Sequence, residues 1–175
     1  MQRSYNGRVR TTEILDRMND CMKIREFNKK DFNGIMKISK LLHPTWFDKV
    51  AINFSMPIDL RIHKGYVIED KRKIIGFVTY TSNEGKAEIS WIGVHPKIHR
   101  KGMGSKLIKK LEANLKKIGV KELRVGTVAE SVEYEPYART RAFYKKIGFS
   151  VEKIIKKISE DTGEIFDFAI LVKKI

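Results

Sequence analysis

The chain has little of what marks secreted or membrane proteins. Its 175 residues include one cysteine and four prolines. A single cysteine, Cys21, excludes an intrachain disulfide and a cysteine-rich metal site. No run approaches the roughly 18 apolar residues that a membrane-spanning helix needs, and the first residues contain no apolar segment typical of a secretory signal. These absences predict a cytoplasmic protein with no membrane partner.

The chain also lacks internal repeats, low-complexity segments and any stretch that reads as a linker. Hydrophobic residues make up 42% of it, so one domain with a substantial core is expected. The first residues are polar and irregular, and patterned sequence starts at Met22. We expect an N-terminal extension over residues 1–21 and a folded domain over residues 22–175. The pattern leaves open whether the first segment is an extension, an extra helix around Ile14–Met18, or a misassigned start.

Hydrophobic periodicity beyond Met22 predicts alternating helices and strands. Strands are expected at residues 22–27, 65–69, 74–81, 86–94, 121–128, 151–158 and 164–173. Helices are expected at residues 31–42, at 46–60 with a break near Pro57, at 102–118 and at 139–147. Three consecutive strands between residues 65 and 94 favour a mixed sheet over a purely parallel one.

The most informative stretch is residues 92–111, in which a strand ends at Val94 and a basic loop leads into Gly102-Met103-Gly104 at a helix start. Glycines let a backbone approach a ligand closely, and the free N–H groups of a helix start bind anions, usually phosphate. The dinucleotide fingerprint fails because Leu107 occupies its third glycine position, and no Walker A sequence is present. Alone, this stretch indicates either an anion site or a structural turn.

A second segment, ARTRAFYKKIGF at residues 138–149, follows one strand later. Together the two segments resemble the GNAT superfamily of acetyl-CoA-dependent N-acetyltransferases. The family pattern Gln/Arg-x-x-Gly-x-Gly/Ala falls on residues 99–104, with His99 in its first position, and the later aromatic-Tyr and Gly-Phe pairs fall on Phe143-Tyr144 and Gly148-Phe149. The resemblance covers all but the N-terminal residues. It implies an α/β (α+β) fold with a mixed, mostly antiparallel central sheet flanked by helices.

The resemblance also implies acetyl-CoA as co-substrate and assigns residues to it. Backbone groups of Ile92, Gly93 and Val94 are expected to pair with the pantetheine arm like a neighbouring strand. The loop and helix start are expected to hold the pyrophosphate, with Arg100 supplying charge beside the unusual His99. The residues assigned to this loop are His99, Arg100, Lys101, Gly102, Met103, Gly104 and Ser105.

Two catalytic residues follow from the same resemblance. Glu88 stands where lysine-acetylating members carry a general base, and Tyr144 matches the tyrosine that protonates the departing thiolate. A base is needed because an alkyl amine, with a pKa of about 10.4, is mostly protonated at pH 7. Ser90, on the same strand face, is placed to help hold a water. The alternatives are a solvated charge for Glu88 and a core aromatic for Tyr144.

No metal site is predicted, because the four histidines show no paired ligand spacing. They are His43, His63, His95 and His99. His95 ends the central strand near the expected acetyl-transfer site, where it either contacts ligand or is structural.

The charge is strongly positive, with 36 Lys+Arg against 21 Asp+Glu and a net charge of +15. The phosphates of coenzyme A account for part of the excess between Lys97 and Ile118. A noncatalytic module that keeps the fold and binds coenzyme A or nucleic acid is the alternative. A lysine-rich solvated helix face without interleaved aromatics makes nucleic acid the less favoured partner. A homodimer is left open.

The acceptor pocket of this fold is expected from residues 41–60 and 129–136. The second segment carries Glu130, Glu133 and Glu135, which favours a small cationic amine unless it is only an acidic surface loop. Acetylation of a protein N-terminus or lysine is the alternative. Members that modify ribosomal proteins usually carry an Asn-x-x-Ala run, whereas residues 137–140 read Tyr-Ala-Arg-Thr. The expected reaction is direct attack of a primary amine on acetyl-CoA in a ternary complex.

Overall fold

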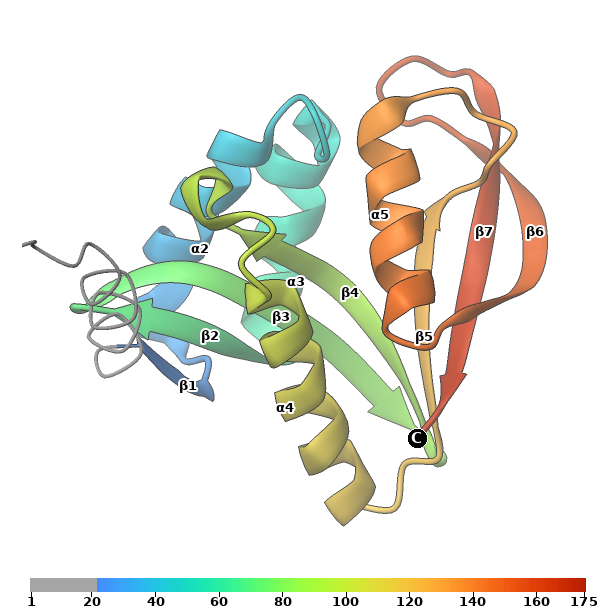
Figure 1. The fold of residues 1–175 in the computed structure, drawn as a ribbon. Helices are drawn as coiled ribbons and strands as arrows, with labels where there is room; N and C mark the ends of the chain where they lie inside the picture. The colour runs from blue at the N-terminus through green and yellow to red at the C-terminus, as the bar shows by residue number, and fades with distance from the viewer. Residues whose placement is uncertain (1–21) are drawn as a thin grey trace, which may run out of the picture.

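The computed structural model describes residues 22–175 as a seven-stranded mixed sheet with helices on both faces (Figure 1). The strands are β1 (Met22–Glu26), β2 (Lys64–Asp70), β3 (Lys73–Asn83), β4 (Lys86–Val94), β5 (Glu122–Val128), β6 (Ser150–Ile158) and β7 (Ile165–Lys174). The helices are α2 (Phe32–Leu42), α3 (Met56–Ile62), α4 (Met103–Lys117) and α5 (Glu135–Lys146), with short turns at Lys29–Asp31, Ala51–Ser55 and Pro96–Ile98. The expectations for residues 1–21, Cys21 included, lie outside the described residues.

The strand order is β1-β2-β3-β4-β5-β7-β6, and β4–β5 is the parallel pair in an otherwise antiparallel sheet. This confirms the expected mixed, mostly antiparallel sheet. Two helix boundaries were predicted wrongly, both at prolines. α5 begins four residues before 139, with Pro136 in its first turn. The helix expected at 46–60 is wrong at its start, because α3 begins at Met56 after the short turn Ala51–Ser55, with Pro57 in its first turn, where proline is well tolerated.

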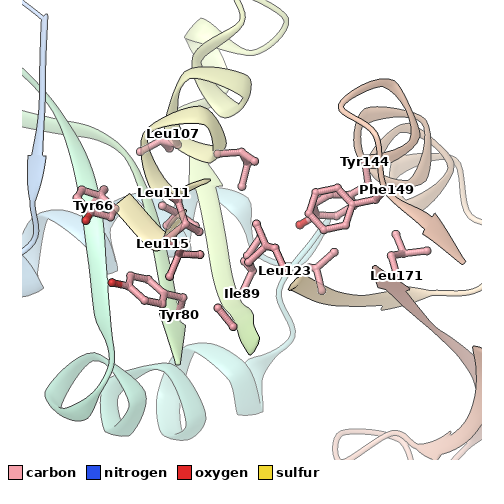
Figure 2. Packing of buried hydrophobic residues seen from close by; sticks show 14 of the residues in the cluster. Tyr66, Tyr80, Ile89, Leu107, Leu111, Leu115, Leu123, Tyr144, Phe149 and Leu171 are labelled. Carbon is pink, nitrogen blue, oxygen red and sulfur yellow. The ribbon is translucent and has the colours of Figure 1, made fainter. Parts of the chain in front are cut away.

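Two hydrophobic clusters divide the core between the faces of the sheet. On the face covered by α4, here called the α4 face, Leu107, Leu111 and Leu115 of α4 pack on strand residues such as Ile89 and Leu123 (Figure 2). α5 adds Tyr144 to this cluster. On the other face, here called the α2–α3 face, a second cluster forms around Ile35, Met56 and Phe77.

The sheet divides between β4 and β5. Pairing runs from Lys86↔Glu122 to Ile89↔Val125 and stops there, although both strands continue. Opposite β3, Thr79 pairs with Trp91 and Tyr80 with Ile89, so Ser90 is an extra residue on β4. Such a bulge bends its strand, and Figure 1 shows β4 and β5 separating beyond it. Beyond the last pair, Ser90–Val94 of β4 and Gly126–Val128 of β5 do not pair with each other. We call these two segments the β4–β5 fork.

Candidate functional site

The β4 side of the fork presents an unpaired backbone edge. The His95 N–H donates to the Ile75 carbonyl at 2.9 Å. Since neighbouring residues in a strand turn their N–H groups to opposite sides, Gly93 also faces β3, while Ile92 and Val94 face the fork. An extended ligand can therefore pair with the Ile92 backbone and the Val94 N–H as a further strand would, while the Val94 carbonyl is already engaged by His99.

Of the three residues predicted to pair with such a ligand, Gly93 has a different role. A Cβ atom at this position would lie 2.6 Å from Phe77 Cε1 and 2.9 Å from Leu42 Cδ1. Its missing side chain makes room for the core of the α2–α3 face. Its backbone N–H and C=O are directed to β3, so they are not available at the fork.

The start of α4 leaves its amide groups free. Gly102 is the N-cap, has a φ of 77°, and no side chain caps the helix. Lys106 is the first residue to bond back, with its N–H 3.0 Å from the Gly102 carbonyl. The amides of Met103, Gly104 and Ser105 thus have no hydrogen-bond partner among residues 22–175. Free amides and the positive end of the helix dipole suit an anion.

The residues predicted for this loop contribute in different ways. A Cβ atom at Gly102 would meet nothing within 4 Å, so a ligand can approach its backbone. A Cβ atom at Gly104 would lie 3.2 Å from Phe143 Cζ, so this glycine lets α4 approach α5. Met103 is a core residue at 8% exposure. The Arg100 and Lys101 side chains are exposed and add positive charge.

The His99 side chain contacts the end of β4 and Trp46. Its Nε2 lies 2.7 Å from the Val94 carbonyl oxygen, and its ring meets the edge of Trp46 at a centroid distance of 5.3 Å. The structure thus gives the imidazole a role in holding the loop to the end of β4. Its predicted contact with pyrophosphate stays a prediction.

Tyr144 combines a buried ring with an unpaired hydroxyl. The residue is 2% exposed, and its ring centroid lies 5.4 Å from that of Phe149. Burial raises the pKa of its hydroxyl, which therefore stays protonated at neutral pH. The hydroxyl has no hydrogen-bond partner among residues 22–175. Figure 2 shows the hydroxyl pointing from α5 toward Ile89 and Leu123. These two residues belong to β4 and β5, the strands that form the fork. Core packing and a proton-donating role are compatible here.

Glu88 lies at the paired end of β4, one residue before the last β4–β5 pair. It is exposed, on the α2–α3 face, and stands opposite Thr81 on β3 and Arg124 on β5. The pKa of Arg124 is raised by its hydrogen bond to Glu122 and further by Glu152 and Glu88. Glu88 thus has a cationic cross-strand neighbour, and its role as base stays a prediction.

Comparison with known proteins decides the family. A model of the acetyltransferase (GNAT) domain matches residues 61–151. The chain belongs to the GNAT family. An uncharacterized protein of Bacillus subtilis, YxbD, is 28% identical over 91 residues, covering 51% of this chain and 52% of that protein. The chain thus matches about half the length of this curated relative.

Solved structures show the same fold. The ribosomal-protein-S18-alanine N-acetyltransferase of Escherichia coli superposes with a TM-score of 0.70 at 20% identity, covering 88% of this chain and 94% of that one. An IAA acetyltransferase of Bacillus cereus gives 0.63 at 21% identity, covering 88% and 99%. The PaiA N-acetyltransferase of Thermoplasma acidophilum, in complex with coenzyme A, gives 0.64 at 19% identity, covering 88% and 99%.

The segments expected to form the acceptor side of this GNAT domain approach each other at Trp46. The Tyr137 hydroxyl of α5 lies 3.5 Å from the Trp46 carbonyl oxygen, and the Trp46 ring contacts His99 beyond β4. Trp46 therefore links the two sides of the fork. In the acidic segment, Glu135 forms an ion pair with Arg139, whereas Glu130 and Glu133 are exposed.

A polar cluster on the α2–α3 face was missed by sequence reasoning. Asp59 of α3 accepts a hydrogen bond from the Trp91 indole N–H at 2.7 Å, and His63 Nε2 lies 3.7 Å from its other oxygen. The four-residue spacing of Asp59 and His63 on a helix was the available signal. Trp91 is 32 residues from Asp59 along the chain, so no local sequence pattern predicts their hydrogen bond.

Thr79 beside this cluster gives a stability prediction. It is fully buried, and its Oγ1 has no hydrogen-bond partner within residues 22–175. Leaving a buried hydroxyl unpaired costs about 1–3 kcal/mol, so Thr79→Val is expected to stabilise the fold by about 1 kcal/mol in urea unfolding. Ser39 is equally buried, but its hydroxyl donates to the Ile35 carbonyl, so Ser39→Ala should give no gain. A Thr79→Val protein no more stable than wild type would contradict this reading.

Among residues 22–175, no group of three or more His, Cys, Asp or Glu side chains is arranged to hold a metal ion. In the same range, no helix is both long enough and apolar enough to cross a membrane.

Proposed function

We propose that this GNAT domain, residues 22–175, transfers the acetyl group of acetyl-CoA to a primary amine, and that it does so in the cytoplasm. The observation that carries the proposal is the fork itself. An unpaired strand edge at Ile92 and Val94 leads toward a helix start with three free amides. An extended arm joined to a pyrophosphate is the ligand class that matches both features.

The residues at the fork fit acetyl-CoA. The amides of residues 101–105 would hold the pyrophosphate, and the exposed Arg100 and Lys101 side chains would offset its charge. The Ile92 and Val94 backbone would bind the pantetheine arm. When bound there, acetyl-CoA supplies an activated acetyl thioester. Membership of the family and the coenzyme A complex of the Thermoplasma acidophilum protein support this assignment.

Two side chains are proposed to move protons. The Glu88 carboxylate, directly or through a water near Ser90, takes the proton that a primary ammonium must lose before attack. The Tyr144 hydroxyl donates a hydrogen bond or proton to the departing sulfur. Burial keeps the pKa of Tyr144 above its ordinary range, so at neutral pH the hydroxyl is protonated and can donate a hydrogen bond.

A small cationic molecule is the proposed acceptor. Exposed Glu130 and Glu133, in a segment beside α5 of a chain with net charge +15, support a positively charged substrate. The second candidate is a polypeptide N-terminus or lysine, favoured by the likeness to a ribosomal-protein-alanine N-acetyltransferase. Residues 137–140 lack the Asn-x-x-Ala run expected of such enzymes.

The test follows free thiol release from acetyl-CoA with a panel of amines, including spermidine, free lysine, an aminoglycoside and a peptide with N-terminal alanine. The proposal expects thiol release above the amine-free rate with at least one amine, and mass spectrometry of that amine should show one added acetyl group. Thermal stability with acetyl-CoA or a short oligonucleotide, in matched salt, is measured in parallel. Stabilisation by the oligonucleotide alone, without thiol release, would favour the noncatalytic module.

A further inference from the structure

Asp59 is held against β4 immediately beyond the bulge that opens the fork. Its Oδ2 accepts the Trp91 indole N–H at 2.7 Å. Trp91 is the first residue after Ser90, where β4 has already parted from β5. The hydrogen bond therefore fixes a carboxylate of α3 to the strand segment that borders the candidate site.

The negative charge of Asp59 is not neutralised by a strong base. Its side chain is 27% exposed, and within residues 22–175 it forms no ion pair with Lys or Arg. Its neighbours are the neutral Trp91 indole and His63, whose Nε2 is 3.7 Å from Oδ1. The more buried carboxylates behave differently, since Asp31 pairs with Arg25, and Glu122 with Arg124 and Lys174. In a chain with 36 Lys+Arg, this leaves Asp59 available to an external cation.

The surroundings of Asp59 suit an organic cation. Trp91 and Glu88 lie on the same α2–α3 face, since they pair with Thr79 and Thr81 of β3, two residues apart. The Phe47 ring meets the Trp91 ring edge-on at a centroid distance of 5.8 Å. Aromatic faces and a carboxylate together attract ammonium groups.

The same cluster is not arranged for stability alone. His63 Nδ1 and Thr79 Oγ1 are the buried side-chain atoms of residues 22–175 that lack a hydrogen-bond partner. Thr79 stands directly opposite Trp91 in the sheet. Unpaired buried polar groups cost free energy, so an apolar cluster here would be more stable, which points to a functional reason for these polar residues.

We propose that Asp59 binds a second, non-reacting ammonium group of the acceptor on the α2–α3 face, with Trp91 as the positioning residue that orients the carboxylate. This inference rests on the proposed function and names its acceptor class as organic cations. Glu88, on the same face, remains the proposed proton acceptor, so the two carboxylates have separate tasks.

The experiment compares Asp59→Asn with wild type, using spermidine and any other amine of the panel that the wild type acetylates. Asparagine keeps an oxygen for the Trp91 N–H and removes the charge. Losing a charge-assisted hydrogen bond should raise KM for the amine about tenfold, with kcat within about threefold and the acetyl-CoA dissociation constant within about twofold. Glu26→Gln, an exposed charge removed from the far edge strand β1, should leave all three unchanged.

Trp91→Phe is the second variant, because it keeps the ring and removes the donor. It should raise KM for the same amine by a smaller factor, about threefold, without changing acetyl-CoA binding. If KM for the amine is unchanged in Asp59→Asn, the inference is overturned. The proposed function still stands in that case, provided that the wild type releases thiol with the amine. Equal losses of amine and acetyl-CoA binding in Asp59→Asn also overturn it, because they indicate a structural role. Failure of the proposed function would differ, since the wild type itself would then release no thiol with any amine.

Discussion

Replacing Tyr144 with phenylalanine is expected to lower kcat about 10- to 1000-fold, the usual range for a positioned acid. The ring stays in place among Phe143 and Phe149, so folding should be preserved. What is lost is a protonated hydroxyl that has no hydrogen-bond partner inside the described chain. The hydroxyl acts on charge that develops late in the reaction. Its removal should therefore change kcat and leave substrate binding unchanged.

The contrast with acetyl-CoA binding carries most of the information in this experiment. The dissociation constant should change by less than about threefold, or roughly 0.7 kcal/mol. Tyr80→Phe is the matched control, because Tyr80 is 6% exposed in the same hydrophobic cluster but belongs to β3. It should turn over at the wild-type rate. If Tyr144→Phe does so as well with the true acceptor, the tyrosine is only a core residue.

Gly102→Val is expected to raise the acetyl-CoA dissociation constant at least tenfold, or about 1.4 kcal/mol. The added side chain would project into the open space beside the free amides of α4, where the pyrophosphate is proposed to lie. Isothermal titration calorimetry measures the change directly. Gly104 is the less informative position, because a side chain there would meet Phe143 and disturb the contact of α4 with α5.

Gly119 provides the control for backbone strain. It follows the other end of α4, has a φ of 81° against 77° at Gly102, and a Cβ there would also meet nothing within 4 Å. A β-branched residue is strained at both positions, so both variants should lose similar stability. Only Gly102→Val should lose acetyl-CoA affinity. Equal affinities in the two variants would mean that the phosphate does not bind at this loop.

Local patterns made much of the fold predictable. Alternating side chains placed β4 at Lys86–Val94, the bounds that the structure has, and the apolar stripe of α4 placed that helix within one residue at each end. Both signals lie within single elements and depend on burial of one face. The loop from Arg100 to Ser105 could be located for the same reason, since glycines before a helix are a local signal.

The parts that sequence could not supply depend on contacts between distant segments. The bulge at Ser90 exists only relative to β3, and the fork only relative to β5. The turn of His99 toward the Val94 carbonyl depends on Trp46, and the Asp59 carboxylate is oriented by Trp91 from another element. The packing of Gly93 against Phe77 and the pairing that directs its N–H to β3 are likewise invisible along the chain.

Amide hydrogen exchange, resolved by residue with NMR, tests the central claim that acetyl-CoA binds along the β4–β5 fork and the start of α4. Saturating acetyl-CoA should slow exchange at Ile92, Val94 and residues 103–105, whose N–H groups face the fork or begin the helix. Gly93 should change little, because its N–H already faces β3. Protection confined to other segments, or no protection under saturating acetyl-CoA, would contradict the account.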